Sequence, residues 1–278
     1  MAGTDDDSGL LNGARVYLSG PMYFGGSQHS GTDEGWRHRV TQVLEDHGAT
    51  VFNPWRKPTV RGLGNYGREG EQNQPYRERF GYDDTEEGAA GRAHCAHQAR
   101  PMLHVDLRMI DASDLMIAFC PTSVYSVGTV HEIARAREQR KPVLLVTPPT
   151  VFPALDELRT HLATDAKAQT LLDQLAEQAS LRPNPGSIPS SWYMALVDSE
   201  SFFDGFGFDD VRDEHPAWAD GELDALERRF PPKRPLFRFL DNIASGRIPD
   251  RRDGDGRTEP NDDWLLFDVA LLARRGGR

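Results

Sequence analysis

Short apolar runs alternate with stretches of helical spacing along the first half of the chain. Apolar runs of strand length occupy 15–19, 50–52, 115–119 and 143–146. Helical spacing occupies 36–47, 105–112 and 129–139, and the first of these helices stops at Gly48, a residue type common just after a helix end. Strands that alternate with helices indicate parallel βαβ units. We therefore expect an α/β fold, a flavodoxin- or Rossmann-like parallel sheet flanked by helices.

The pattern divides the chain into three parts. Residues 1–13 form an acidic tail that we expect to be disordered. Residues 14–150 are the α/β core, and a long insertion at about 55–103 has little periodicity. Residues 151–278 are expected to be a mainly helical elaboration packed on the core, with helices at 152–163, 167–179, 236–244 and 264–273. Within it, the aromatic run 202–208 suits an interface.

Composition and charge narrow the classes of function. The chain has 278 residues and a net charge of −11, which argues against binding of duplex nucleic acid. Its two cysteines, Cys95 and Cys120, lie in no metal-binding spacing. We place Cys95 in a polar loop and Cys120 in the core. No apolar run approaches about 20 residues, the length of a membrane span. We expect a cytoplasmic protein with no metal and no cofactor.

The run from Ser126 to Glu132 carries the candidate chemistry. It follows the apolar strand 115–119 and opens a helix, whose free N–H groups and positive dipole end attract anions. Glu132 is expected on the first turn of that helix. A carboxylate can attack or stabilise the oxocarbenium-like sugar that forms when an N-glycosidic bond breaks. The other interpretation, that Glu132 merely complements the helix dipole, stays open.

Two further residues could complete such a site. Tyr17, at the end of the first strand, could donate its hydroxyl to Glu132, or it could be a half-buried strand aromatic. Asp106 is placed at the start of a helix, either as a structural first-turn acid or as a proton donor to the leaving base. Asp114 precedes a strand and is interpreted as a structural cap. The turn glycines Gly20 and Gly128 suit close approach of backbone to a ligand.

Together these motifs resemble the nucleoside 2-deoxyribosyltransferase superfamily. The matching residues are Tyr17-Leu18-Ser19-Gly20-Pro21, then Asp106 and Asp114, then Gly128-Thr129 with Glu132. The resemblance covers roughly residues 14–150 and implies a flavodoxin-like fold and a covalent glycosyl intermediate on Glu132. It implies that Tyr17 orients this nucleophile and that Asp106 lies near base and sugar.

Position 126 separates the branches of that superfamily. Transferases that use free nucleosides carry an aspartate six residues before the nucleophile, whereas this chain has Ser126, as in the branch similar to nucleoside 5′-monophosphate N-glycosidases. A serine hydroxyl can donate to a phosphate that an aspartate would repel. The expected contacts to sugar and phosphate are Gly20, Pro21, Met22, Tyr23, Arg37, Ser126, Gly128 and Thr129.

The chain departs from the superfamily pattern in two places. The loop after the first strand, at Met22 and Tyr23, lacks the arginine of the monophosphate hydrolases, so Arg37 or an arginine of the insertion must neutralise the phosphate. In the superfamily a neighbouring subunit often supplies a Ser or Asn two residues before a Met. Here the corresponding residues are Ser191, Trp192 and Met194, which implies a homodimer or larger homo-oligomer.

The expected function is an enzyme that hydrolyses the N-glycosidic bond of a (2′-deoxy)nucleoside 5′-monophosphate. It would release the free base and (deoxy)ribose 5-phosphate. Three alternatives remain: a transferase that exchanges bases between deoxynucleosides, a nucleotide-binding regulatory module without turnover, and an effector that cleaves NAD. The base and the preference at the 2′ position are left open.

Overall fold

Five parallel strands form one sheet in the order β2-β1-β3-β4-β5. The computed structural model describes residues 9–21, 35–56, 80–122, 124, 126–207, 221–247, 251–252 and 255–259. The sheet strands are β1 Arg15–Ser19, β2 Thr50–Phe52, β3 Leu115–Phe119, β4 Val143–Val146 and β5 Phe202–Phe203. A separate antiparallel pair joins β6 Arg251–Arg252 to β7 Thr258–Glu259. The predicted α/β class is confirmed, and the strand order is that of flavodoxin-like folds.

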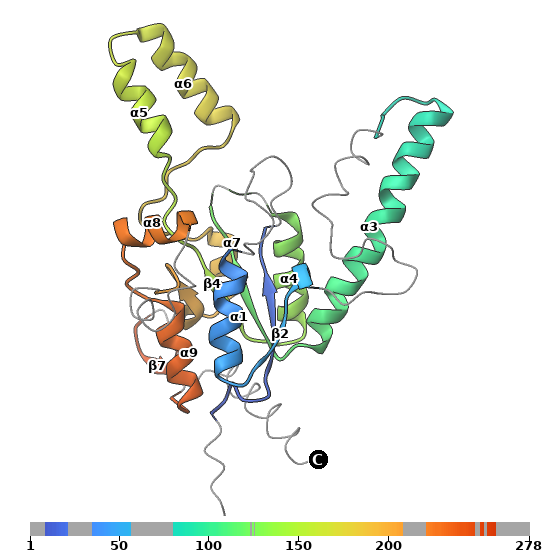
Figure 1. Ribbon diagram of the computed structural model, residues 1–278, viewed down its shortest axis with the longest axis vertical. Coiled ribbons are helices and arrows are strands. Elements are labelled where there is room, and N and C mark those ends of the chain that lie inside the picture. The colour runs from blue at the N-terminus through green and yellow to red at the C-terminus, as the bar shows by residue number, and fades with distance from the viewer. Residues whose placement is uncertain are drawn as a thin grey trace, which may run out of the picture.

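Helices connect the strands and extend beyond them (Figure 1). The described helices are α1 Trp36–Asp46, α3 Glu86–Ala112, α4 Val127–Glu138, α5 Pro153–His161, α6 Ala166–Gln178, α7 Ser191–Met194, α8 Gly221–Arg229 and α9 Leu236–Ala244. Short 3₁₀ turns lie at η1 Pro54–Arg56 and η2 Ser199–Ser201. Helix α1 ends where Gly48 adopts a φ of 78°, as its role after a helix end requires.

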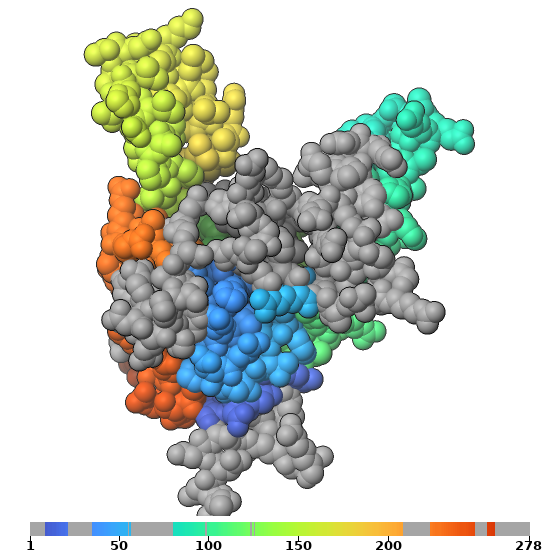
Figure 2. All heavy atoms as spheres, viewed as in Figure 1, coloured from blue at the N-terminus to red at the C-terminus, as the bar shows by residue number. Residues whose placement is uncertain are grey.

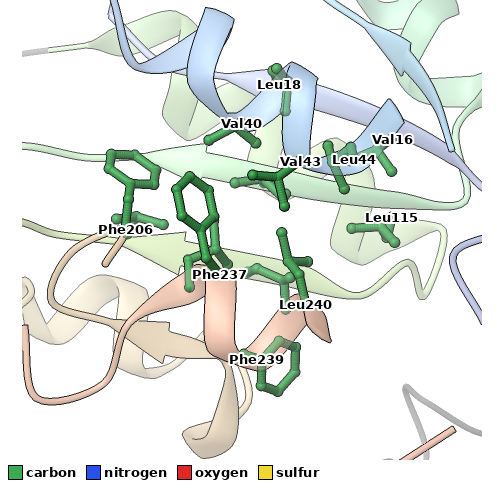
Figure 3. Packing of buried hydrophobic residues seen from close by; sticks show 14 of the residues in the cluster. Val16, Leu18, Val40, Val43, Leu44, Leu115, Phe206, Phe237, Phe239 and Leu240 are labelled. Atoms are coloured by element: carbon green, nitrogen blue, oxygen red, sulfur yellow. The ribbon is translucent and has the colours of Figure 1, made fainter. Parts of the chain in front are cut away.

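Alternate residues of each strand face opposite sides of the sheet, so the molecule has two apolar layers. Val16 and Leu18 of β1 face a layer that also holds α1 and α9. In Figure 3, Phe237 and Leu240 of α9 lie in the same buried layer as Val43 of α1. On the other side, Tyr17 faces a layer built with α3 and α4. The sequence around β1 thus places its even-numbered residues against one pair of helices and its odd-numbered residues against the other.

The helix before β3 is much longer than the predicted 105–112. It begins at Glu86 and runs through Pro101 to Ala112. Thr85 caps its start by accepting a hydrogen bond from Gly88 N at 3.1 Å. Residues 86–103 of the expected irregular insertion are therefore helical, and Cys95 lies in a helix and not in a loop. The part of the insertion at 57–79 lies outside the described residues.

Two other expectations about the chain ends need correction. The tail predicted as disordered to residue 13 extends too far, because 9–13 form a turn in which Leu11 is fully buried. In the aromatic run 202–208 expected at an interface, Phe203 and Phe206 lie in the core instead of on an exposed surface, and Phe208 lies outside the described residues. Moreover, β5 pairs with β4, so the C-terminal third supplies a strand of the sheet as well as helices. The predicted helix 264–273 lies outside the described residues.

Two helical arms stand away from the body at the same end of the molecule (Figures 1 and 2). One is the hairpin of α5 and α6, whose base is closed by an antiparallel bridge between Thr150 and Asn184. The other is the N-terminal part of α3. Helix α5 follows the carboxyl end of β4, and α3 ends just before β3 begins. Because α3 ends where β3 begins and is much longer than that strand, its N-terminal part extends past the opposite edge of the sheet. Both arms therefore lie beyond the edge where the parallel strands end.

Among the described helices, none combines the length and the apolar character needed to cross a lipid bilayer.

Candidate active site

The carboxyl end of β1 brings two hydroxyl groups to the carboxylate of Glu132. Tyr17 Oη donates to Glu132 Oε1 at 2.9 Å, and Ser19 Oγ donates to Glu132 Oε2. Tyr17 and Ser19 are two residues apart on a strand, so their side chains leave the same face of the sheet. Both residues are fully buried. Each oxygen of the carboxylate is thereby held by its own donor, next to the point where strand order reverses between β1 and β3.

Glu132 is a poor acid in these surroundings. Burial, with a smaller contribution from the negative charge of Asp106, raises the pKa of its carboxyl from 4.5 to a net value of about 7. Hydrogen bonds from Ser19 and Tyr17 and the charge of Arg37 oppose the shift. Burial and then Glu132 raise the pKa of Tyr17 well above its usual value, so Tyr17 stays a neutral donor. The site can therefore hold Glu132 either protonated or ionised near neutral pH.

Helix α4 begins earlier than predicted, which changes the place of Glu132. Ser126 is the N-cap, and its Oγ accepts from Thr129 N at 3.4 Å and lies 2.6 Å from Thr129 Oγ1. Because the helix starts at Val127, Glu132 lies in its second turn. The prediction that Glu132 lies in the first turn is wrong. The first turn of α4 holds no acidic residue. Complementing the helix dipole is therefore a weak explanation of Glu132, since that effect fades beyond the first turn.

Asp106 reaches the site from α3, and not from a helix start as predicted. It lies in the last two turns of that 27-residue helix, so it is neither an N-cap nor a first-turn acid. Its charge raises the pKa values of both Glu132 and Tyr17, so it lies near enough to both to act on them electrostatically. Asp114 lies elsewhere and is structural: its Oδ2 accepts from Arg15 N at 2.8 Å, and its Oδ1 lies 3.4 Å from Arg15 Nη2.

Arg37 and the turn after β1 form one packed unit. Arg37 is buried, and its Nη2 donates to Gly20 O at 2.7 Å. Its Nη1 lies 3.5 Å from Pro21 O. Gly20 is needed for packing, because a Cβ there would lie 2.7 Å from the Trp36 ring. Arg37 thus supports the backbone beneath the site and adds positive charge near Glu132. The expected contacts Met22 and Tyr23 lie outside the described residues.

The remaining predicted contacts differ in exposure. Thr129 is buried and bonded to Ser126, so its amide is already capped within α4. Gly128 is exposed, and a Cβ there would meet nothing within 4 Å. The start of α4 therefore has open space at Gly128 for a ligand, but the N–H of Thr129, which was expected to bind the phosphate, already bonds to Ser126. The roles of these residues stay predictions.

Helix α7 sends its tyrosine, and not its tryptophan, toward the site. Trp192 is 80% exposed and Met194 51% exposed, and Ser191 is exposed as well. Their expected contribution to a neighbouring subunit stays a prediction. Tyr193 packs on the α3–α4 side of the sheet and shares a hydrogen bond with Cys120. Burial is the main cause that raises the pKa of the Cys120 thiol to about 12; the hydrogen bond with Tyr193 opposes this rise and the charge of Glu132 adds to it. Cys120 is in the core, as predicted.

Ser19 is the residue that the sequence interpretation missed. It was seen only as part of the Tyr17-to-Pro21 motif, although the two-residue period of a strand puts it on the same side as Tyr17. The assembled group is a partly buried carboxylate with a hydroxyl donating to each oxygen, and with Asp106 and Arg37 near enough to act on its charge. Such an arrangement can attack an electron-poor carbon and can exchange a proton with a leaving group.

Comparison with known proteins identifies the family. The family model of nucleoside 2-deoxyribosyltransferases matches residues 16–168, more than half of the chain. A solved 2-deoxyribosyltransferase from Bacillus psychrosaccharolyticus is 22% identical, with a TM-score of 0.29, covering 49% of this chain and 73% of that chain. None of the curated proteins matches. The residues matched by the family model include Tyr17 of β1, Asp106 of α3 and Glu132 of α4. The chain belongs to the nucleoside 2-deoxyribosyltransferase family.

Proposed function

We propose that this chain hydrolyses the N-glycosidic bond of a (2′-deoxy)nucleoside 5′-monophosphate. The observation that supports it most is the partly buried carboxylate of Glu132, with Tyr17 and Ser19 bonded to its two oxygens. A carboxylate held in one orientation can present a defined oxygen to C1′ of a bound sugar, and such orientation of the reacting atoms lowers the barrier to attack. Family membership supports the transfer or hydrolysis of a glycosyl group. Ser126 supports a substrate that carries a 5′-phosphate.

The reaction has two steps. In the reactive state Glu132 is ionised and Asp106 carries the proton. An oxygen of Glu132 attacks C1′ while the bond from C1′ to the base nitrogen breaks, and Asp106 gives its proton to the departing base. The product of this step is a glycosyl ester on Glu132. A water molecule then attacks C1′, its proton passes to Asp106, and the Glu132 carboxylate is released. The net reaction consumes one water and yields free base and sugar 5-phosphate.

Ser126 supports a phosphorylated substrate because it is uncharged at the start of α4. A carboxylate at this position would repel a phosphate dianion by about 4 kcal/mol per charge pair at 4 Å in a partly buried site. An oxygen of Ser126 already caps the helix, and Gly128 beside it is open to solvent. A helix start of this kind accommodates an anion.

The first experiment compares substrates. The purified protein is incubated with each of the common nucleoside and 2′-deoxynucleoside 5′-monophosphates, and released base is measured by chromatography. Parallel samples contain deoxynucleosides with a different free base. We expect base release from a monophosphate and little from the matching nucleoside. Base exchange without a preference for phosphate would instead identify a transferase, the activity for which the family is named.

Two variants connect the activity to the site. Glu132→Gln keeps the size of the side chain but removes the nucleophile, and we expect it to lower kcat/KM by at least about a thousandfold. Glu138→Gln is the matched control, because Glu138 lies on the same helix with its side chain 69% exposed. If Glu132→Gln retained wild-type turnover, the assignment of the nucleophile would be wrong.

Ser126→Asp isolates the phosphate contact. Aspartate is as good an N-cap as serine, so α4 should keep its start while a negative charge is added. We expect kcat/KM for the monophosphate to fall at least about a hundredfold. Ser126→Asn, a neutral N-cap, should retain activity within about tenfold. Equal activity of Ser126→Asp and Ser126→Asn on a monophosphate would contradict a phosphate near residue 126.

A further inference from the structure

Ser19 lies at the end of β1 and has a side chain with no solvent exposure. Its hydroxyl donates to Glu132 Oε2, while Tyr17 donates to Oε1. A buried serine at the end of a strand could serve packing alone. Here its hydroxyl is directed at the carboxylate that the proposed function makes the nucleophile.

We propose that Ser19 is a positioning residue, whose hydroxyl fixes the plane of the Glu132 carboxylate and keeps that carboxylate ionised for attack. This inference rests on the proposed role of Glu132 as nucleophile. Two donors on two different oxygens prevent rotation about the last side-chain bond, which a single donor from Tyr17 would permit. A carboxylate oxygen has two lone pairs, so each oxygen accepts its hydrogen bond and keeps a lone pair for C1′.

The balance of charges around Glu132 shows why the second donor matters. Burial and the charge of Asp106 on α3 favour the protonated form, while Arg37 on α1 favours the ionised form. The hydrogen bond from Ser19 is the largest effect that lowers the pKa of Glu132, ahead of the bond from Tyr17. The thiol of Cys120, after β3, also lies near Glu132 and stays protonated. Without the Ser19 hydroxyl, Tyr17 and Arg37 remain to oppose the rise in the pKa of Glu132 that burial and Asp106 cause. The pKa of Glu132 should therefore rise.

The experiment measures Glu132 directly in the protein without ligand. The carboxyl carbon of Glu132 is followed by ¹³C NMR during a pH titration, with its signal assigned by its loss in Glu132→Gln. In Ser19→Ala we expect the titration midpoint to rise by about 1 pH unit or more, since a hydrogen bond to a charged group contributes about that much. If the protein cleaves nucleotides, the loss in kcat/KM should be about 5- to 15-fold at pH 7 and should shrink above pH 9.

Ser113→Ala is the matched control. Ser113 is another buried serine, whose Oγ donates to Ile110 O at 2.8 Å and to no carboxylate. It should lower stability by a similar amount and leave the Glu132 midpoint unchanged. Ser19→Cys keeps a side chain of similar size with a weaker donor, so its midpoint should fall between those of wild type and Ser19→Ala. This variant carries the test if Ser19→Ala fails to fold.

The outcomes separate this inference from the proposed function. If the titration midpoint of Glu132 in Ser19→Ala and Ser19→Cys equals that of wild type, Ser19 serves packing alone. The inference is then overturned even if the enzyme cleaves nucleotides. If wild type releases no base from any nucleotide, the proposed function fails. In that case the NMR midpoint still decides whether Ser19 controls the ionisation of Glu132. A loss of activity that is equal at pH 7 and pH 9 would also count against the inference.

Discussion

Glu132 shows how a functional carboxylate can reduce the stability of the fold that holds it. Its pKa is about 7 in the folded protein against 4.5 for an ordinary glutamate, mainly because it is buried. Between these two values the folded protein keeps a proton that the unfolded chain releases. The free energy of unfolding therefore falls as pH rises from about 4.5 to 7, and it stays lower above pH 7.

Glu132→Gln should remove this cost. We expect the variant to be about 1–3 kcal/mol more stable than wild type at pH 8 and about equally stable at pH 4.5. Urea denaturation at the two pH values measures the difference, and Glu138→Gln should show no such dependence because its side chain is exposed. Equal stability of wild type and Glu132→Gln at pH 8 would mean that the ionised carboxylate is not penalised by the fold.

At the scale of single residues, the sequence predicted the pairing of Tyr17 with Glu132 and missed the part of Ser19. The pairing followed from motif order, whereas a serine carries little signal until a fold shows what it faces. Asp106 was assigned to a helix start and lies instead near the C-terminal end of α3, because the earlier turns of that helix gave no signal in the sequence. Its role as a proton donor stays a prediction. Arg37 was a candidate for phosphate, which stays a prediction, and the structure shows it bound to the backbone at Gly20 and Pro21.

At the scale of elements, the predicted strands 15–19, 50–52, 115–119 and 143–146 have the observed bounds. Each is a short apolar run between turn residues, a signal that depends on neighbours only. The N-terminal part of α3 escaped prediction because its sequence has no apolar stripe. At 27 residues it is about 40 Å long, far more than the 5-residue strand β3 beside it requires. Strand β5 escaped because it has two residues.

The hairpin of α5 and α6 should be dispensable for the stability of the core. Its base is closed by hydrogen bonds from Thr150 N to Asn184 O at 3.0 Å and from Asn184 N to Thr150 O at 2.6 Å. Leu158, Leu171 and Leu175 on the hairpin are all about half exposed. Replacement of 153–182 by Asn-Gly keeps the two ends close, so we expect the melting temperature to change by less than about 5 °C.

Circular dichroism during heating measures this change. A fall of more than about 10 °C would show that the hairpin stabilises the sheet, contrary to its placement outside the two apolar layers. The base-release assay on the same variant then reports whether this arm contributes to activity.

At the scale of the whole molecule, the C-terminal third is bonded into the core by buried polar groups. Arg39 Nη1 of α1 lies 2.6 Å from Asp224 Oδ1 of α8, and both side chains are nearly inaccessible. Glu227 on the same helix accepts from Phe206 N at 2.9 Å. Buried charges of this kind are costly when one partner is lost. The predicted boundary at residue 150 stays a prediction, but the parts on its two sides share one sheet and one core.

Asp224→Asn should destabilise the protein strongly. It removes the carboxylate from the buried guanidinium of Arg39, and we expect a loss of about 3–5 kcal/mol in the free energy of unfolding. The double variant Arg39→Met with Asp224→Leu should recover most of that loss. Asp173→Asn is the control, because its 2.7 Å pair with Arg159 is exposed and should contribute less than about 1 kcal/mol. Urea denaturation measures all three, and equal losses in the two aspartate variants would contradict the buried pair.

The late position of α9 affects how the chain must be made. Strands β1, β3 and β4 are complete once Val146 has been synthesised, yet the helix that covers part of their apolar face begins at Leu236. A ribosome adding about 5–20 residues per second needs roughly 5–20 s for the 89 residues between these points. During that interval the nascent sheet has an uncovered apolar side, which makes it a substrate for chaperones and prone to aggregation when synthesis is fast and chaperones are scarce.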